Sequence, residues 1–235
     1  RGASALVTGA GRGIGRAVAV ALGGGGAAVT LVARTKSDLD ETARQVKAAG
    51  GRAAVHVGDL RRPADCEAAV AAAVAAHGGL RVVVNNAGIG SHANVADTGD
   101  DVWDDILQTN LGAVFRVTRA ALPHLAKDGG HVFMISSLAG RNAIAGMAAY
   151  CASKAALDHF AACLMLEVRH QGVKVTTIAP GSVDTSFGRE PGKTRGAEWM
   201  LTAQDVADAV VDLLATRDAA HLSRVEMRPL RPPKA

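Results

Sequence analysis

Residues 3–22 read ASALVTGAGRGIGRAVAVAL, and this stretch decides the predicted fold. Ala3–Thr8 is a short apolar strand, and an alanine- and valine-rich helix runs to Leu22. Between them, glycines at 9, 13 and 15 give the spacing G-x-x-x-G-x-G, which differs from the G-x-G-x-x-G dinucleotide fingerprint. Such a turn lets backbone N–H groups and a helix N-terminus approach a pyrophosphate. We therefore expect a phosphate-binding turn here, with an ordinary tight strand–helix turn as the alternative.

The rest of the chain alternates between apolar strands and amphipathic helices. Further strands are expected at 28–33, 53–57, 80–84, 131–135, 173–178 and 222–227, and further helices at 37–49, 63–77, 101–125, 149–170 and 203–215. We find no domain linker and no repeat. The alternation predicts a single α/β domain over residues 1–235, with a parallel sheet covered by helices on both faces.

Composition excludes several classes of protein. About half of the 235 residues are hydrophobic and a fifth are charged, as in globular domains. The net charge of +4 comes from scattered basic residues without interleaved aromatics, so no nucleic-acid site is expected. No apolar run reaches a membrane-spanning length, and the first residues do not predict a signal peptide. Three cysteines without metal-ligand spacing predict reduced thiols, no metal site and a cytoplasmic location.

The chemistry is expected around Tyr150 and Lys154, which are four residues apart and share one face of a helix. Ser137 follows the apolar strand 131–135, where ligands bind in open α/β sheets. A neighbouring ammonium favours the phenolate and lowers the pKa of a tyrosine toward the range useful for acid–base catalysis. The serine hydroxyl can hold a carbonyl or alcohol oxygen beside the phenol. By itself, however, a tyrosine and a lysine at this spacing also occur by chance.

Other strand ends and one helix carry further candidates. Asp59 ends the third strand, where it can accept an adenine amino group or cap the loop, and position alone favours the loop. Asn110 is an unfavourable residue for the middle of a helix, and its apolar neighbours predict that it lies near the buried side. Residues 182–200 are polar and rich in glycine and proline, and we predict a substrate lid there.

Taken together, these motifs resemble the short-chain dehydrogenase/reductase family over essentially the whole chain. The matching elements are TGAGRGIG at 8–15, Asp59-Leu60, NNAG at 85–88, Asn110, Ser137, YCASK at 150–154, and Pro180-Gly181 with Val183 and Thr185. The resemblance implies a Rossmann-type doubly wound sheet of seven parallel strands that binds a nicotinamide dinucleotide.

The family's site residues carry over to matching positions of this chain. By resemblance, Tyr150 is the acid/base, Lys154 holds the nicotinamide ribose and lowers the tyrosine pKa, Ser137 binds the substrate oxygen, and Asn110 holds a relay water. Ser137 rather than Ser136 matches, because it stands thirteen residues before the tyrosine. The implied cofactor contacts are Gly9, Gly13, Ile14 and Gly15 for the pyrophosphate, Asp59 and Leu60 for adenine, Asn86, Ala87 and Gly88 for the adenosine ribose, and Pro180, Gly181, Val183 and Thr185 beside the nicotinamide.

Charge at the end of the second strand indicates the choice of cofactor. NAD-preferring enzymes place a carboxylate there, whereas here Arg34 follows the strand and no acid precedes Asp38, in the next helix. An arginine can pair with a 2′-phosphate, and Arg12 in the glycine turn adds a second cation if the family geometry holds. The alternative is that both arginines are solvated surface residues. We predict NADP(H), with NAD(H) less favoured.

The sequence therefore predicts an oxidoreductase that acts on CH–OH donors and interconverts a ketone or aldehyde and an alcohol. The alternative is a dinucleotide-binding regulator or scaffold without turnover, although such a protein has no need of all four catalytic residues.

The C-terminal RVEMRP at 224–229 lacks the glycine-rich finish of carrier-linked ketoacyl reductases and resembles relatives acting on small hydroxy acids. Substrate candidates are thus a β-ketoacyl thioester, a small hydroxy acid or another carbonyl compound. Apolar excess on the helices at 101–125 and 149–170 predicts a homo-oligomer, and the resemblance to the family implies a tetramer rather than a dimer.

Overall fold

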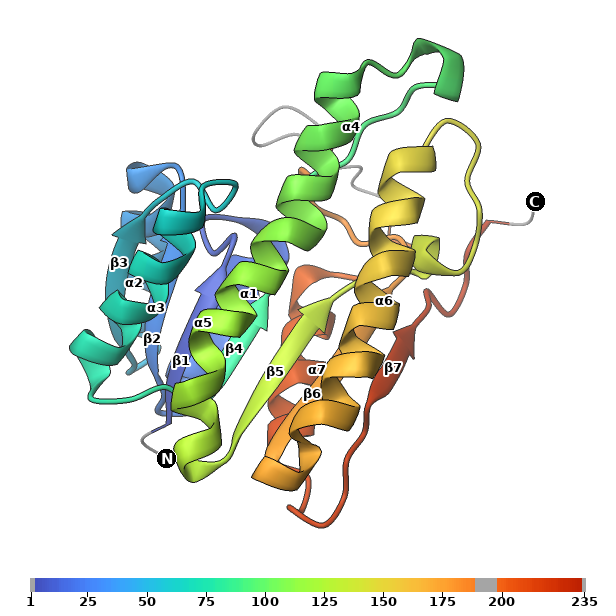
Figure 1. The fold of residues 1–235 in the computed structure, drawn as a ribbon. Helices are drawn as coiled ribbons and strands as arrows, with labels where there is room; N and C mark the ends of the chain where they lie inside the picture. The colour runs from blue at the N-terminus through green and yellow to red at the C-terminus, as the bar shows by residue number, and fades with distance from the viewer. Residues whose placement is uncertain (1–2, 189–197, 234–235) are drawn as a thin grey trace.

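A computed structural model describes residues 3–188 and 198–233, and within them seven parallel strands form one sheet in the order β3-β2-β1-β4-β5-β6-β7 (Figure 1). The strands are β1 (Ser4–Thr8), β2 (Ala28–Ala33), β3 (Arg52–Val57), β4 (Val82–Asn85), β5 (Gly130–Ile135), β6 (Val173–Pro180) and β7 (Arg224–Met227). The α-helices are α1 (Gly13–Gly24), α2 (Lys36–Ala48), α3 (Pro63–His77), α4 (Asp100–Leu107), α5 (Ala113–Asp128), α6 (Ala148–Val168) and α7 (Ala203–Leu214). The predicted seven-stranded doubly wound sheet is confirmed.

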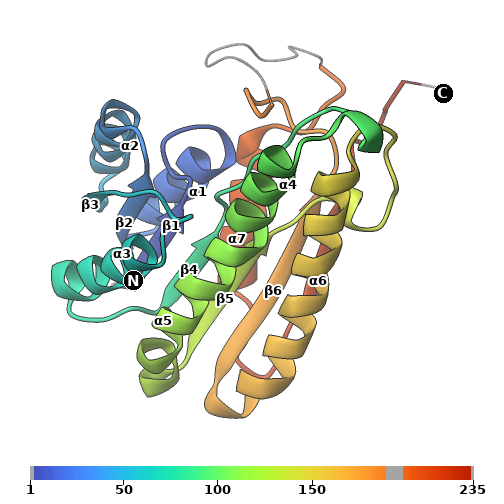
Figure 2. The ribbon, with the colours of Figure 1, turned by 45° about the horizontal axis from the view of Figure 1, so that its top comes forward.

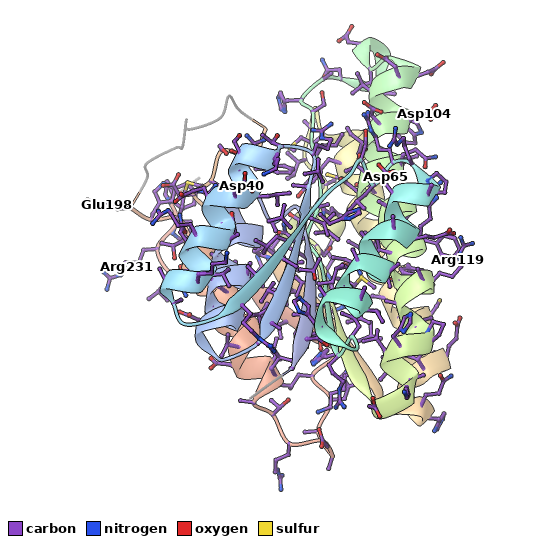
Figure 3. All side chains as sticks on the ribbon, turned by 90° about the vertical axis from the view of Figure 1, so that its left-hand side faces the viewer. Asp40, Asp65, Asp104, Arg119, Glu198 and Arg231 are labelled. Carbon is purple, nitrogen blue, oxygen red and sulfur yellow. The ribbon has the colours of Figure 1, made fainter. Side chains whose placement is uncertain are left out.

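Two layers of helices bury the two faces of this sheet (Figure 2). Helices α3, α5 and α6 cover one face, while α1, α2 and α7 cover the other. Side chains alternate along each strand, so in β1 Leu6 packs under the first layer and Val7 under the second. Strands buried on both faces must be apolar throughout, which explains why they contain runs of valine, leucine and alanine. Figure 3 shows charged side chains on the outer surfaces of the two helix layers, with Asp40 on one layer and Asp65 and Arg119 on the other.

The sheet order places a crevice between β1 and β4. From β1 the chain winds through β2 to β3 at one edge, then crosses back to β4 and winds toward β7 at the other edge. The loops that leave β1 and β4 therefore turn away from each other. Ligands of doubly wound sheets bind at this switch point, beyond the carboxyl ends of the strands.

Several element boundaries differ from the sequence prediction by a few residues, and two of these differences have identifiable physical reasons. The fourth strand begins at Val82 rather than at 80, after the exposed Arg81. The expected helix 101–125 is longer and is interrupted by a π-helical turn, Gln108–Gly112, between α4 and α5. Asn110 lies in this turn, so the residue that disfavours a regular helix stands where the helix widens. None of the helices in the described residues is long and apolar enough to cross a membrane.

Candidate active site

A cleft of about 1100 Å³ opens at the carboxyl ends of the strands. Its walls contain most of the predicted site residues: Gly9, Arg12, Gly13, Ile14, Arg34, Asp59, Leu60, Asn86, Ala87, Gly88, Ser137, Tyr150, Lys154, Pro180, Gly181, Val183 and Thr185. Two others, Gly15 and Asn110, lie behind the wall. The structure thus brings together residues that are spread over nearly the whole chain.

The glycine turn after β1 is tightly packed. Gly9 and Gly13 have φ angles of +64° and +55°, a region that side chains rarely adopt. A Cβ on Gly15 would lie 2.3 Å from the carbonyl oxygen of Gly9 and 2.5 Å from Nδ2 of Asn86. Gly15 therefore serves the packing of the turn, which is why it does not reach the cleft.

Hydrogen bonds hold this turn against the segment that follows β4. The hydroxyl of Thr8 accepts the backbone N–H groups of Asn86 and Ala87, both at 3.0 Å. In return, the side-chain amide of Asn86 donates to the carbonyl oxygens of Thr8, at 2.9 Å, and Gly9, at 3.2 Å. These bonds fix the two sides of the switch-point crevice relative to each other.

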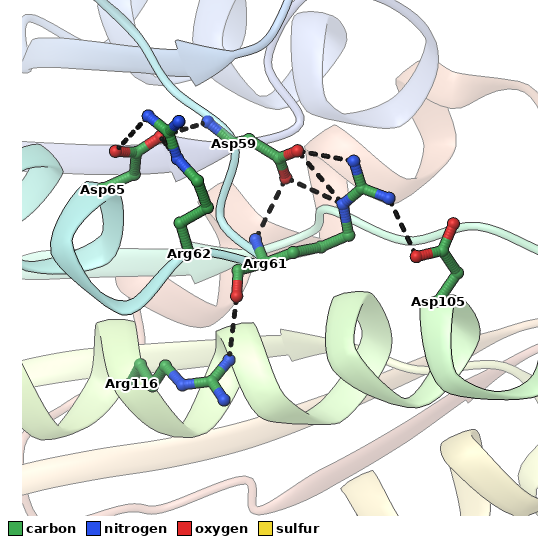
Figure 4. Close-up of polar contacts among 6 residues, drawn as sticks. All are labelled: Asp59, Arg61, Arg62, Asp65, Asp105 and Arg116. Atoms are coloured by element: carbon green, nitrogen blue, oxygen red, sulfur yellow. Dashed lines mark hydrogen bonds and ion pairs between the residues drawn. The ribbon is translucent and has the colours of Figure 1, made fainter. Parts of the chain in front are cut away.

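At one end of the cleft, Arg61 bridges the loop after β3 and helix α4 (Figure 4). Its guanidinium donates to both carboxylate oxygens of Asp59 and, through Nη1, to Asp105 at 2.8 Å. The backbone N–H of Arg61 also donates to Asp59, and the hydrogen bond from the Arg61 side chain holds the pKa of Asp59 below its usual value. Asp59 thus holds its own loop, as its position alone indicated, and it also lines the cleft. Arg61 could not be identified from the sequence, because its partner Asp105 is 44 residues away.

The neighbouring wall carries Arg12 and Arg34, both exposed. Asp38 belongs to α2, as expected, but the first turn of this helix brings it to the same wall. Its Cβ lies 3.0 Å from the position that a Cβ on Gly11 would occupy. Asp38 therefore lines the cleft although it belongs to the next helix, since this helix begins at the cleft itself. Two cations and one carboxylate share this wall.

At the other end of the cleft, Tyr150 and Lys154 project from one face of α6 toward the end of β5. Lys154 is 4% exposed, its ammonium donates to the carbonyl oxygen of Ile135 at 2.8 Å, and burial lowers the pKa of this lysine to about 8. The ammonium lies 5.8 Å from the centre of the Tyr150 ring.

The pKa of Tyr150 is shifted in the direction opposite to the one expected. Burial raises it, and a hydrogen bond with the Ser137 side chain acts in the lowering direction. Lys154 was expected to lower the pKa of Tyr150, but it is not among the groups that shift this pKa. The reason is geometric, because the ammonium is directed to the Ile135 carbonyl rather than to the phenol oxygen.

Asn110 is fully buried and ties three segments together behind Lys154. Its Oδ1 accepts the backbone N–H of Ile89 at 2.8 Å, and its Nδ2 donates to the carbonyl of Ile89 at 2.9 Å and to the hydroxyl of Ser153 at 3.0 Å. A Cβ on Gly88 would lie 3.3 Å from Oδ1 of Asn110 and 3.7 Å from Nζ of Lys154. The prediction that Asn110 lies on the buried side is confirmed.

Phe187 covers Tyr150 at the mouth of the cleft. The two rings are tilted at 52°, with their centres 5.5 Å apart, and Phe187 also packs where a side chain on Gly90 would stand. No sequence motif marks Phe187, although it falls within the predicted lid, and none marks Gly90. Of the predicted lid 182–200, residues 189–197 lie outside the described residues.

Comparison with known proteins agrees with this geometry. The sequence profile described as short chain dehydrogenase matches residues 3–196.

The chain belongs to the short-chain dehydrogenase family.

Among its relatives, an uncharacterised oxidoreductase of Staphylococcus epidermidis is 34% identical over 227 residues, which are 96% of this chain and 96% of that protein. A putative ketoacyl reductase of the monensin polyketide synthase from Streptomyces virginiae is 37% identical over 205 residues, which are 86% of this chain and 78% of that protein.

Solved structures of short-chain dehydrogenases superpose on nearly the whole chain. The alcohol dehydrogenase of the archaeon Thermococcus sibiricus, complexed with 5-hydroxy-NADP, matches with a TM-score of 0.91 and 28% identity, over 99% of both chains. A metagenomic short-chain oxidoreductase in complex with NADP gives a TM-score of 0.86 and 36% identity, over 98% of both chains. An actinorhodin polyketide ketoreductase with NADPH gives a TM-score of 0.88 and 31% identity, over 97% of this chain and 96% of that chain.

Proposed function

We propose that this short-chain dehydrogenase is an NADP(H)-dependent oxidoreductase that interconverts a ketone or aldehyde and an alcohol, with Tyr150 as the acid/base. The observation that carries the proposal is the meeting of Ser137, Tyr150 and Lys154 at the end of β5, in the same cleft as the glycine turn. A regulator that only binds a dinucleotide would need the glycine turn but would not need this trio.

The residues of the cleft fit a dinucleotide. Gly9 and Gly15 leave no room for side chains, and the positive φ angle of Gly13 disfavours one, so backbone N–H groups at the start of α1 can face a pyrophosphate. When bound, the dinucleotide supplies or accepts the hydride. A carbonyl oxygen becomes an alcohol only when hydride transfer to carbon is matched by proton transfer to oxygen, so the site also needs a proton donor beside that oxygen.

Tyr150 is suited to that proton transfer. In carbonyl reduction its phenol donates a proton to the substrate oxygen, while the Ser137 hydroxyl holds the same oxygen. A protonated Lys154 offsets the negative charge that then forms on the phenol oxygen. Asn110 fixes the segment from Gly88 to Ile89 beside this lysine through its bonds to Ile89.

The choice of NADP(H) rests on Arg12 and Arg34, whose guanidinium groups can pair with a 2′-phosphate. The structures complexed with NADP, NADPH and 5-hydroxy-NADP support it by similarity. Asp38 on the same wall acts in the opposite direction, because a carboxylate repels a phosphate. We infer that the two arginines outweigh it.

Two classes of carbonyl substrate have support. The named ketoacyl reductase among the relatives favours a β-ketoacyl thioester. The C-terminal sequence at 224–229 favours a small hydroxy acid instead. A panel that contains both classes, followed by the absorbance of the nicotinamide, distinguishes them.

Tyr150→Phe tests the mechanism, because it removes the phenol oxygen and keeps the ring. Loss of a general acid/base lowers kcat by at least about 100-fold, from the usual contribution of such groups. NADPH affinity, measured by fluorescence titration, should change little. Turnover close to that of the wild type would reject Tyr150 as the acid/base.

A further inference from the structure

Asp158 is a buried carboxyl group to which the proposed mechanism gives no role. It lies on α6, it is 6% exposed, and neither of its carboxyl oxygens has a hydrogen-bond partner among residues 3–188 and 198–233. A buried carboxylate without hydrogen bonds is expensive, so proteins rarely keep one without a charged partner. Its surroundings therefore indicate what it does.

Asp158 lies in the contact between α6 and the short turn η3 (Leu138–Gly140), which directly follows Ser137. A Cβ on Gly140 would lie 3.1 Å from Oδ2 of Asp158 and 3.1 Å from both the carbonyl carbon and the carbonyl oxygen of Lys154. The absence of a side chain at Gly140 allows this close approach. Asp158 is thus enclosed between the turn that follows Ser137 and the helical turn that carries Lys154.

Lys154 precedes Asp158 by four residues, so the two side chains lie on the same face of α6. Both are buried, and the ammonium of Lys154 is hydrogen-bonded to a neutral carbonyl. Burial lowers the pKa of Lys154, and the charge of Asp158 acts in the raising direction. No other charged group in the described residues is found to act on this lysine.

The other titratable groups on the elements packed around this contact are engaged or distant. Arg141, after η3, pairs with Glu226 of β7, and the acidic residues of α4 are exposed. On β5 and β6, the titratable side chains stand near the opposite ends of the strands from Lys154: His131 and Lys174. On α6 itself, burial raises the pKa of Tyr150, which keeps the phenol neutral. His159, Cys163 and Glu167 of the same helix are exposed.

We propose that Asp158 is a positioning residue of the active site, whose ionised carboxylate is the counter-charge that keeps Lys154 protonated beside Tyr150. Asp158 acts through the lysine and touches neither substrate nor cofactor. This inference rests on the proposed function, since a protonated Lys154 matters for turnover only if Tyr150 transfers the proton.

The first test is the pH profile of kcat/KM for carbonyl reduction by wild type and Asp158→Asn, with saturating NADPH. Glu167→Gln is the matched control, because it removes the same charge from an exposed position of the same helix. Wild type should lose activity above a pH of about 8, where Lys154 deprotonates. In Asp158→Asn this limb should move down by about one pH unit, which is about a fivefold loss at pH 8 and little change at pH 6. Asp158→Glu should keep the wild-type limb.

The second test needs no turnover. The pKa of Lys154 is lower in the folded protein than its ordinary value of 10.5. Between pH 10.5 and about 8 the unfolded chain therefore binds a proton that the folded protein does not, and the free energy of unfolding decreases as pH falls through this range. Removal of Asp158 lowers the folded pKa further, so urea should unfold Asp158→Asn more readily relative to wild type at pH 7 than at pH 10. If the asparagine variant does not fold, Asp158→Ser replaces it in both measurements, because it also removes the carboxylate.

Two results would overturn the inference. One is a pH profile of Asp158→Asn that superimposes on that of wild type. The other is an infrared band of a protonated carboxyl group in the wild-type protein at pH 7, because a neutral Asp158 cannot be a counter-charge. If wild type reduces no carbonyl compound at all, the proposed function fails instead, while the unfolding and infrared measurements still decide the charge state of Asp158.

Discussion

The substitution Gly15→Ala should disrupt the glycine turn, and the contacts around Gly15 set the size of the effect. The new methyl group would lie 2.3 Å from the carbonyl oxygen of Gly9 and 2.5 Å from Nδ2 of Asn86. Relief of this overlap requires a backbone shift, which costs about 1–3 kcal/mol of stability at overpacked sites. It also breaks the two hydrogen bonds that Asn86 donates to Thr8 and Gly9, worth about 1 kcal/mol each.

Helix propensity works against this loss, because alanine stabilises a helix interior by about 1 kcal/mol relative to glycine. The free energy of unfolding of Gly15→Ala should therefore fall by about 2–4 kcal/mol. Gly24→Ala is the matched control in the same helix, where the added methyl group meets nothing closer than 3.8 Å. This variant should be as stable as wild type or more stable, by up to about 1 kcal/mol.

Urea unfolding followed by circular dichroism measures both variants, and NADPH fluorescence reports on the turn itself. Gly15→Ala should also weaken NADPH binding by at least about tenfold, since one charge-assisted hydrogen bond to a phosphate is worth about 1.5–3 kcal/mol. If Gly15→Ala unfolds within about 0.5 kcal/mol of Gly24→Ala, the turn adapts freely and the reasoning is refuted.

Three further predictions concern charge and assembly. Arg34→Asp should lower the ratio of kcat/KM with NADPH to that with NADH by at least about tenfold, from the loss of one ion pair to the 2′-phosphate; an unchanged ratio would show that Arg34 does not face the ribose. Burial lowers the pKa of His131 to about 3, so folding opposes its protonation and stability should fall below pH 6.5, by about 2 kcal/mol at pH 5. His131→Gln should flatten that slope in acid unfolding curves, and an unaltered slope would assign it to other groups. Exposed Trp103, Phe115 and Leu166 on α4, α5 and α6 should be covered in a homotetramer, and a monomeric mass by light scattering at micromolar concentration would contradict this.

The fold could be predicted because its determinants are local in the sequence. Apolar runs separated by amphipathic segments specify a parallel sheet covered on both faces, whatever the detail of any single contact. The pairing of Tyr150 with Lys154 follows from helical spacing, and Ser137 is placed by the end of a strand. The roles of these residues and the cytoplasmic location stay predictions.

The rest of the site depends on contacts that no local pattern records. Arg61 meets Asp105 because the loop after β3 and helix α4 converge across the cleft. Asp38 reaches the wall because α2 begins beside the glycine turn, and Phe187 covers Tyr150 from a segment without regular structure. The pKa of Tyr150 was predicted in the wrong direction because spacing gives the neighbour but not where its ammonium is directed.

The hydroxyl of Thr8 has a consequence for how the protein is made. Its two N–H donors come from Asn86 and Ala87, 78 and 79 residues later in the chain. A ribosome that has released only the first three strands has already synthesised every glycine of the turn, yet not the segment that holds it. Contacts between residues so distant in sequence form late in folding. A nascent chain that ends after β3 should therefore be unable to retain a nucleotide, and binding should arise in one step once β4 pairs with β1.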